Sequence, residues 1–150
     1  MITISIMKIK HGFLACLLSL LAFTTFAAEL PDAKAIQGNW FPVKAELGGK
    51  SMPDAVLKTI SLKLADGKYE VMAGGHPDNG TYSIDTNASP KRMTVIGTEG
   101  PNKGKTFPCI YELKDDTLRI CYDLSGEKHP DAFKSLPGTK LYLVTYDRKK

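Results

Sequence analysis

Short runs of alternating apolar and polar residues recur along most of this chain and constrain its fold more than any other feature. The runs are bounded by glycine, proline, asparagine or aspartate, and they follow one another at a spacing of about 8 to 12 residues, as in all-β sandwiches and barrels. No low-complexity segment or linker divides them into two domains. We therefore expect one all-β domain.

The clearest hairpin in the sequence joins residues 60–64 to residues 69–73. Apolar side chains alternate in both runs, and Asp66-Gly67 between them is a two-residue turn whose backbone twist suits a hairpin. This turn predicts three cross-strand pairs: Leu64 with Tyr69, Leu62 with Val71, and Lys63 with Glu70. The two apolar pairs share one face and the charge pair lies on the other, so packing and charge agree on the register.

Eight runs of strand character follow position 28: residues 40–47, 60–64, 69–73, 80–84, 92–98, 107–113, 117–124 and 140–146. A short helical turn is expected after the first run, with Ala55, Val56 and Leu57 as its apolar face. Eight antiparallel strands joined by short turns hide their edges by closing into a barrel. We therefore predict an eight-stranded antiparallel up-and-down barrel, with a two-sheet sandwich as the alternative.

The first residues have the pattern of a secretory signal peptide. Lys8 and Lys10 precede an apolar run at 13–26, which is short for a membrane span and ends in small residues. Cleavage after Ala27 separates a signal peptide at 1–27 from a barrel domain at 28–150. We expect an exported protein, periplasmic or secreted, with no membrane span in the mature chain; an uncleaved anchor helix is the alternative.

Charge and motifs exclude several classes of function. Residues 28–150 carry 18 basic and 16 acidic residues, because only Lys8 and Lys10 of the 20 basic residues precede them. This balance differs from the basic face of a nucleic-acid-binding protein. The sequence has no nucleophile-elbow serine, no His-Glu-x-x-His and no Cys-x-x-Cys motif. We expect neither an enzyme nor a bound cofactor.

Cys109 and Cys121 are the cysteines of the predicted domain, and an oxidising compartment permits a disulfide between them. Pairing Leu113 with Leu118 across the 114–116 turn puts Cys109 on the inner face and Cys121 on the outer face. A bond between them then needs a β-bulge near the turn. The disulfide and two free, partly buried thiols remain alternatives.

An up-and-down order sends alternate connections to the same end of a barrel. The connections at one end are residues 48–59, 74–79, 99–106 and 125–139, and binding residues concentrate on loops of this kind. Two of these loops carry the tripeptide His-Pro-Asp, and their weak candidate metal ligands are His76, Asp78, His129 and Asp131. The alternative is that these residue types are simply common in exposed turns.

The same order predicts which side chains line a cup that is open at this end. The candidate ligand-binding residues are Leu62, Tyr69, Val71, Tyr82, Met93, Tyr111, Ile120 and Tyr122. An apolar interior with a few hydroxyl groups suits a small lipophilic ligand. The alternative is a filled core, with mouth loops that bind a secreted protein partner, for example as an inhibitor of a secreted hydrolase.

Gly38-Asn39-Trp40, just before the first run, resembles the Gly-x-Trp signature of the lipocalins. Further matching segments extend to about Asp147: Gly48-Gly49-Lys50 with Pro53, Asp66-Gly67-Lys68-Tyr69, Gly80-Thr81-Tyr82, residues 99–105, Ile110-Tyr111-Glu112-Leu113 and residues 116–121. In this order and spacing the chain resembles a family of uncharacterised bacterial lipocalin-like secreted domains, best known from planctomycetes, in the calycin and lipocalin superfamily.

The resemblance implies a barrel of lipocalin type and no established activity. In that superfamily the signature tryptophan packs across the closed end of the barrel, with a basic side chain from near the last strand over it. The structural residues of the closed end would then be Gly38, Trp40 and Arg148. Cys109 departs from the family pattern, which implies that the family does not require a disulfide.

Overall fold

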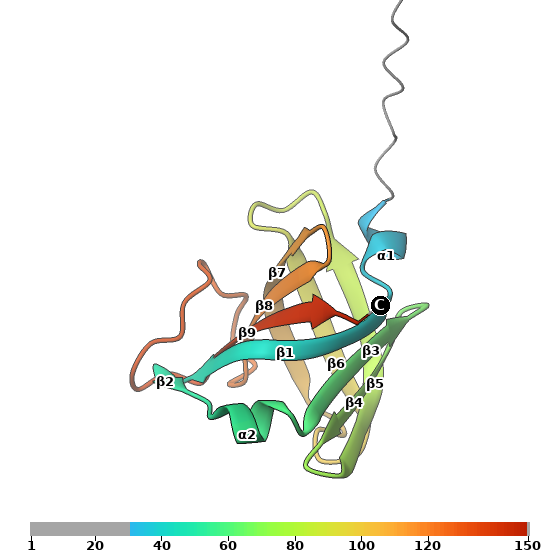
Figure 1. Cartoon of the computed structure of the whole chain (residues 1–150). Helices are drawn as coiled ribbons and strands as arrows, with labels where there is room; N and C mark the ends of the chain where they lie inside the picture. Colours follow the sequence, from blue (N-terminus) through green and yellow to red (C-terminus); the bar gives the residue numbers. More distant parts are fainter. Residues whose placement is uncertain (1–30, 150) are drawn as a thin grey trace, which may run out of the picture.

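The computed structural model describes residues 31–149, and most of them lie in antiparallel strands that wrap around a barrel (Figure 1). Two short helices accompany the strands in this range, α1 at Asp32–Ala35 and α2 at Asp54–Leu57. The strands are β1 (Gly38–Leu47), β2 (Lys50–Ser51), β3 (Ile60–Ala65), β4 (Lys68–Ala73), β5 (His76–Asp85), β6 (Arg92–Glu99), β7 (Thr106–Lys114), β8 (Thr117–Asp123) and β9 (Leu141–Arg148).

The strands follow one another around the barrel in chain order, and the two-residue β2 pairs only with the end of β1. Hydrogen bonding runs from β1 through β3 to β9, and β9 pairs back with β1 from Trp40–Arg148 to Leu47–Tyr142. The eight longer strands of residues 31–149 therefore form a closed up-and-down barrel. The predicted barrel and the predicted helical turn after its first strand are both confirmed.

The β3–β4 hairpin has the register that its turn predicts. Asp66 and Gly67 have φ angles of 49° and 75°, the left-handed values that a two-residue hairpin turn requires and that glycine adopts without strain. The pairs in the structure are Leu62–Val71, Leu64–Tyr69 and Lys63–Glu70, with 3.4 Å between the ammonium and carboxylate groups of the last pair. Turn chemistry and side-chain alternation together align this part of the sheet.

The β7–β8 hairpin also has its predicted register, with Leu113 opposite Leu118. Because side chains along a strand point alternately to the two faces of the sheet, this register puts the two thiols on opposite faces. Cys109 packs in the core, whereas the thiol of Cys121 points outward to the carbonyl oxygen of Lys134 at 3.5 Å. Both are buried free cysteines, so the disulfide considered above does not form.

Strand β5 begins earlier than the sequence pattern indicates, at His76 rather than Gly80. Gly74 and Gly75, with φ angles of 57° and 82°, form a two-residue turn, and β5 pairs with β4 directly after it. The expectation of a mouth loop at 74–79 was therefore wrong, because hydrogen bonds to β4 engage the backbone groups of this segment. Asp78 consequently lies on a strand, with its side chain in the barrel interior.

The predicted signal peptide, residues 1–27, lies outside the described residues. Within residues 31–149 neither helix has the length and apolar character needed to cross a membrane. Helix α1, which no sequence pattern indicated, leads directly to Ile36, a fully buried residue of the core.

Candidate ligand site at the open end of the barrel

The two ends of the barrel are built differently (Figure 1). Helix α1 lies at one end, and α2 and the long segment 124–140 lie at the other. Trp40 closes the first end: its side chain is fully buried, and its indole nitrogen donates a hydrogen bond to the carbonyl oxygen of Ile36 at 2.9 Å. Packing and a satisfied polar group therefore seal this end.

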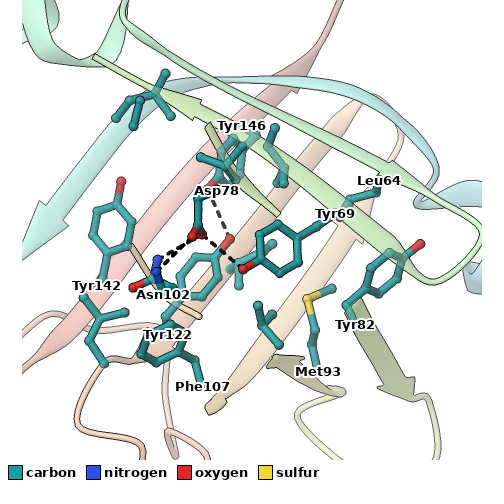
Figure 2. A pocket seen from close by; sticks show the side chains of 17 residues that line it. Leu64, Tyr69, Asp78, Tyr82, Met93, Asn102, Phe107, Tyr122, Tyr142 and Tyr146 are labelled. Atoms are coloured by element: carbon teal, nitrogen blue, oxygen red, sulfur yellow. Dashed lines mark hydrogen bonds between the residues drawn. The ribbon is translucent and has the colours of Figure 1, made fainter. Parts of the chain in front are cut away.

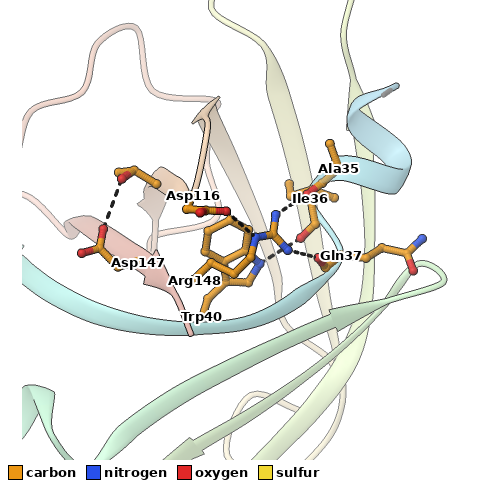
Figure 3. Close-up of polar contacts among 8 residues, drawn as sticks. Ala35, Ile36, Gln37, Trp40, Asp116, Asp147 and Arg148 are labelled. Carbon is orange, nitrogen blue, oxygen red and sulfur yellow. Dashed lines mark hydrogen bonds and ion pairs between the residues drawn. The ribbon is translucent and has the colours of Figure 1, made fainter. Parts of the chain in front are cut away.

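Arg148 covers the outer face of this tryptophan (Figure 3). Its guanidinium carbon lies 4.2 Å from the ring centroid, within the range of a cation–π interaction. The guanidinium donates to the carbonyl oxygens of Ala35 and Gln37, and its Nε lies 3.4 Å from the carboxylate of Asp116. A Cβ on Gly38 would lie 2.5 Å from the guanidinium, so glycine leaves the room this arrangement needs. The three residues expected at the closed end thus meet there.

Tyr111 belongs to the closed end as well, although the sequence analysis assigned it to the ligand site. Its hydroxyl group donates to Asp32 at 2.8 Å, beside the ammonium group of Lys91 at 2.7 Å from the same oxygen. Burial disfavours the charge of Asp32, but the hydrogen bonds from Lys91 and Tyr111 outweigh this effect and lower the pKa of that carboxyl group. Tyr111 does not reach the cavity at the other end, so its assignment to the lining was wrong.

The other end of the barrel contains a cavity of about 190 Å³ (Figure 2). Its walls are mainly aliphatic and aromatic side chains from the strands. The lining residues are Ile60, Leu62, Leu64, Tyr69, Val71, Ala73, Asp78, Tyr82, Met93, Val95, Asn102, Phe107, Ile120, Tyr122, Leu124, Tyr142 and Tyr146. All of the candidate lining residues except Tyr111 are among them.

Asp78, from β5, places a buried carboxyl group in this apolar wall. The residue is 8% exposed. Its Oδ2 accepts hydrogen bonds from the hydroxyl group of Tyr69 at 3.1 Å and from the side-chain amide of Asn102 at 2.9 Å. Its Oδ1 accepts from the backbone N–H of Asn102 at 3.0 Å. In each of these hydrogen bonds the partner is the donor and the carboxyl group is the acceptor, as expected for its ionised form.

Asn102 reaches Asp78 because the connection between β6 and β7 folds back against β5. Gly100, with φ of 86°, approaches β5 closely: a Cβ there would lie 2.5 Å from the carbonyl oxygen of Pro77. At Gly97 a Cβ would lie 2.0 Å from the carbonyl oxygen of Asn102. Sequence reasoning missed Asn102, and the glycines at 97 and 100 are the signal that backbone approaches backbone here.

Tyrosines supply most of the remaining polar groups of the cavity. The hydroxyl groups of Tyr122 and Tyr146 are 3.1 Å apart, and the rings of Tyr122 and Tyr142 stack with centroids 5.6 Å apart. Burial is the main cause that raises the pKa of Tyr69, Tyr122 and Tyr146; Asp78 adds to the effect at Tyr69, and neighbouring phenol groups add to it at Tyr122 and Tyr146. These phenols therefore stay neutral at physiological pH and keep both a donor and acceptor lone pairs.

The four weak candidate metal ligands do not come together. His76 is exposed at the start of β5, Asp78 is engaged inside the barrel, the ring of His129 contacts the carbonyl oxygen of Cys109 at 2.8 Å, and Asp131 pairs with Lys128. Residues 31–149 contain no group of three or more His, Cys, Asp or Glu side chains arranged to hold a metal ion. Strand pairing at 76–79 turns Asp78 inward, away from the rim on which the hypothesis put it.

Protein-family models, curated proteins and solved structures all give no match to this chain. The resemblance of the sequence to bacterial lipocalin-like domains therefore remains a proposal. The closed up-and-down barrel is nevertheless an architecture that can enclose one small ligand, and the geometry of the cavity is the basis for inferring a function.

Proposed function

We propose that this protein binds a small, mostly apolar molecule in the open end of its barrel. The observation that carries the proposal is the cavity of about 190 Å³, lined mainly by aliphatic and aromatic side chains with a few polar groups among them. Small-molecule sites generally have this composition, because apolar walls supply affinity and a few polar groups orient the ligand.

The volume limits the size of the ligand. An apolar cavity of about 150 Å³ is large enough to bind benzene. A cavity of about 190 Å³ therefore suits a single aromatic ring with a short substituent.

Filling the cavity tests this proposal. Val71 lines the cavity from β4, whereas Val43 on β1 is 52% exposed, so Val→Phe at these positions adds the same ring inside and outside the barrel. We expect phenethyl alcohol, titrated calorimetrically, to bind wild-type protein and Val43→Phe alike and to bind Val71→Phe at least about tenfold more weakly. Equal affinity for the two variants would mean that the ligand binds elsewhere, which contradicts the proposal.

We further propose that residues 1–27 direct export and that the chain is a lipocalin-like domain of the bacterial family its sequence resembles. The apolar run at 13–26 and the small residues that end it support export. Expression of the full chain in a bacterial host, followed by mass measurement of the periplasmic protein, should yield a chain that begins at Ala28. An unprocessed chain in the membrane fraction would contradict this.

A protein-binding role for the mouth loops is the second candidate, supported by the segment 124–140. This segment extends away from the strands in Figure 1, and Leu136 within it is 47% exposed. The cavity argues against the filled interior that this candidate expects. If it is correct, replacing 125–139 with a short Gly-Ser linker abolishes capture of a secreted partner; an unchanged set of captured proteins counts against it.

A further inference from the structure

Asp78 is a buried carboxylate without an ion-pair partner among residues 31–149. The ion pairs of this part of the chain involve other acidic residues, from Asp32 to Asp131. A charge removed from water is costly unless hydrogen bonds or an opposite charge compensate for it. The other buried carboxylate, Asp123, is compensated by the turn that follows it, through Ser125 and the backbone N–H of Lys128, whereas Asp78 faces a cavity.

The hydrogen bonds of Asp78 do not use its full capacity. Oδ2 accepts two, from Tyr69 and Asn102, but Oδ1 accepts only one, from the backbone N–H of Asn102. An ionised carboxyl group offers about four acceptor positions. One position thus remains on a negatively charged side chain that lines the cavity (Figure 2). The donors already present are neutral, so no positive charge of the described residues pairs with this carboxylate.

Aromatic rings surround the same space. Tyr69, Tyr82, Tyr122, Tyr142 and Tyr146 all line it, and no lysine, arginine or histidine of the described residues does. The face of an aromatic ring attracts a cation within about 6 Å of its centroid, more strongly when the cation is removed from water. The carboxylate and the rings together make the cavity a negative, weakly hydrated environment, which favours a cation and repels an anion.

Given the small-molecule site proposed above, we infer that its ligand is a small organic cation, a primary amine on an apolar and preferably aromatic body. The ammonium group donates to the free position on Asp78, and the phenol oxygens of Tyr122 and Tyr146 offer further acceptors. The apolar body packs against Met93 and Val95 deeper in the barrel. The single described charge of the cavity wall is then neutralised by the ligand.

Asp78 also ties the 100–105 connection to β5, so the experiment has to separate its charge from this tie. Three ligands of nearly equal shape do so: phenethylamine, phenethyl alcohol and phenylacetate. In calorimetric titrations of wild-type protein at neutral pH, we expect the amine to bind at least about tenfold more tightly than the alcohol, and phenylacetate not to bind measurably.

Two variants assign the preference to the carboxylate. Asp78→Asn keeps the size of the side chain and removes its charge, and it should reduce the ratio of amine affinity to alcohol affinity from at least about tenfold to about one. Asn102→Ala removes the side-chain hydrogen bond of the tie, leaves the one from the backbone N–H and keeps the charge, so it should retain the preference. If Asp78→Asn fails to fold, as judged by circular dichroism, the titrations of wild-type protein and of Asn102→Ala still decide whether the site prefers a cation.

The outcomes also separate this inference from the proposed function. Wild-type protein that binds the alcohol as tightly as the amine overturns the cation inference and leaves the small-molecule site standing. If Asn102→Ala no longer prefers the amine, the preference depends on the position of the 100–105 connection. That result overturns the role we give to the charge of Asp78. Absence of binding for all three ligands, with Val71→Phe indistinguishable from wild type, overturns both the inference and the site.

Discussion

The two ends of this barrel each set a charged group against aromatic rings, with opposite results. At the closed end the guanidinium of Arg148 lies over the ring of Trp40, backbone carbonyls accept its hydrogen bonds, and a carboxylate forms an ion pair with it. At the open end the carboxylate of Asp78 lines a cavity rich in tyrosine, and only neutral groups of the described residues donate to it. The protein supplies the opposite charge in the first arrangement, and the described residues supply none in the second.

The ends also differ in how completely they are filled. Trp40, Leu118 and Ile36 are fully buried and pack at the closed end, whereas the opposite half of the same barrel keeps a cavity of about 190 Å³. Protein interiors are generally close-packed, and an unfilled cavity lowers stability. Among the described residues the unfilled space lies at one end of the barrel, which is where we propose that a ligand binds.

The largest effect is expected from Trp40→Ala, which would break the closed end. Loss of a fully buried tryptophan, its hydrogen bond and its contact with Arg148 should lower the free energy of unfolding by about 3–5 kcal/mol. Urea denaturation measures this, with Val43→Ala on the exposed surface as the matched control. A loss similar to that of the control would show that Trp40 does not hold this end together.

A pair of Tyr→Phe variants sharpens the comparison between the ends. Tyr111→Phe removes the hydroxyl group that donates to Asp32, and Tyr122→Phe removes one that contacts Tyr146 in the cavity. Each should lower the free energy of unfolding by about 1 kcal/mol, because each deletes one partly buried hydrogen bond. Only Tyr122→Phe should weaken calorimetric binding of phenethylamine. Equal weakening by both variants would mean that the two ends do not act separately.

The smallest effect is a pH dependence at the closed end. The pKa of Asp32 is lowered in the folded protein, so its ionised form adds stability that is present above the unfolded value of 3.8 and is lost as pH falls through the folded value. Asp32→Asn should therefore cost about 1 kcal/mol or less at neutral pH. In urea denaturation the difference from wild type should shrink below pH 3.8. A difference independent of pH would contradict the ion pair with Lys91.

Local patterns in the sequence predicted the eight barrel strands, apart from the early start of β5, and the registers of two hairpins. The Asp66-Gly67 turn and the alternation around it determine the β3–β4 pairs, and the same reasoning at Leu113 and Leu118 determines which thiol faces inward. Both features depend on residues a few positions apart. The position of Gly38, Trp40 and Arg148 at one end was implied by family resemblance, since no local pattern relates residues so distant in the chain.

The candidate site was predicted only in part. Alternation shows which face a side chain points to but not how deep along the barrel axis it lies, which is why Tyr111 was assigned to the wrong end. Asp78 was treated as a loop residue because the Gly74-Gly75 turn was overlooked, and that turn is what extends β5. Asn102 meets Asp78 through a tertiary contact between segments 24 residues apart, which no spacing in the sequence indicates.

The most direct test of the open end as a binding site is a methyl-detected NMR titration of the protein with phenethylamine. We predict that chemical-shift changes concentrate on Leu62, Val71 and Ile120, which line the cavity, and leave Ile36 and Leu118 of the closed end unchanged. Shifts that concentrate at the closed end or on the exposed Val43, or no shifts at saturating amine, would contradict the account of the open end as a site for a small organic cation.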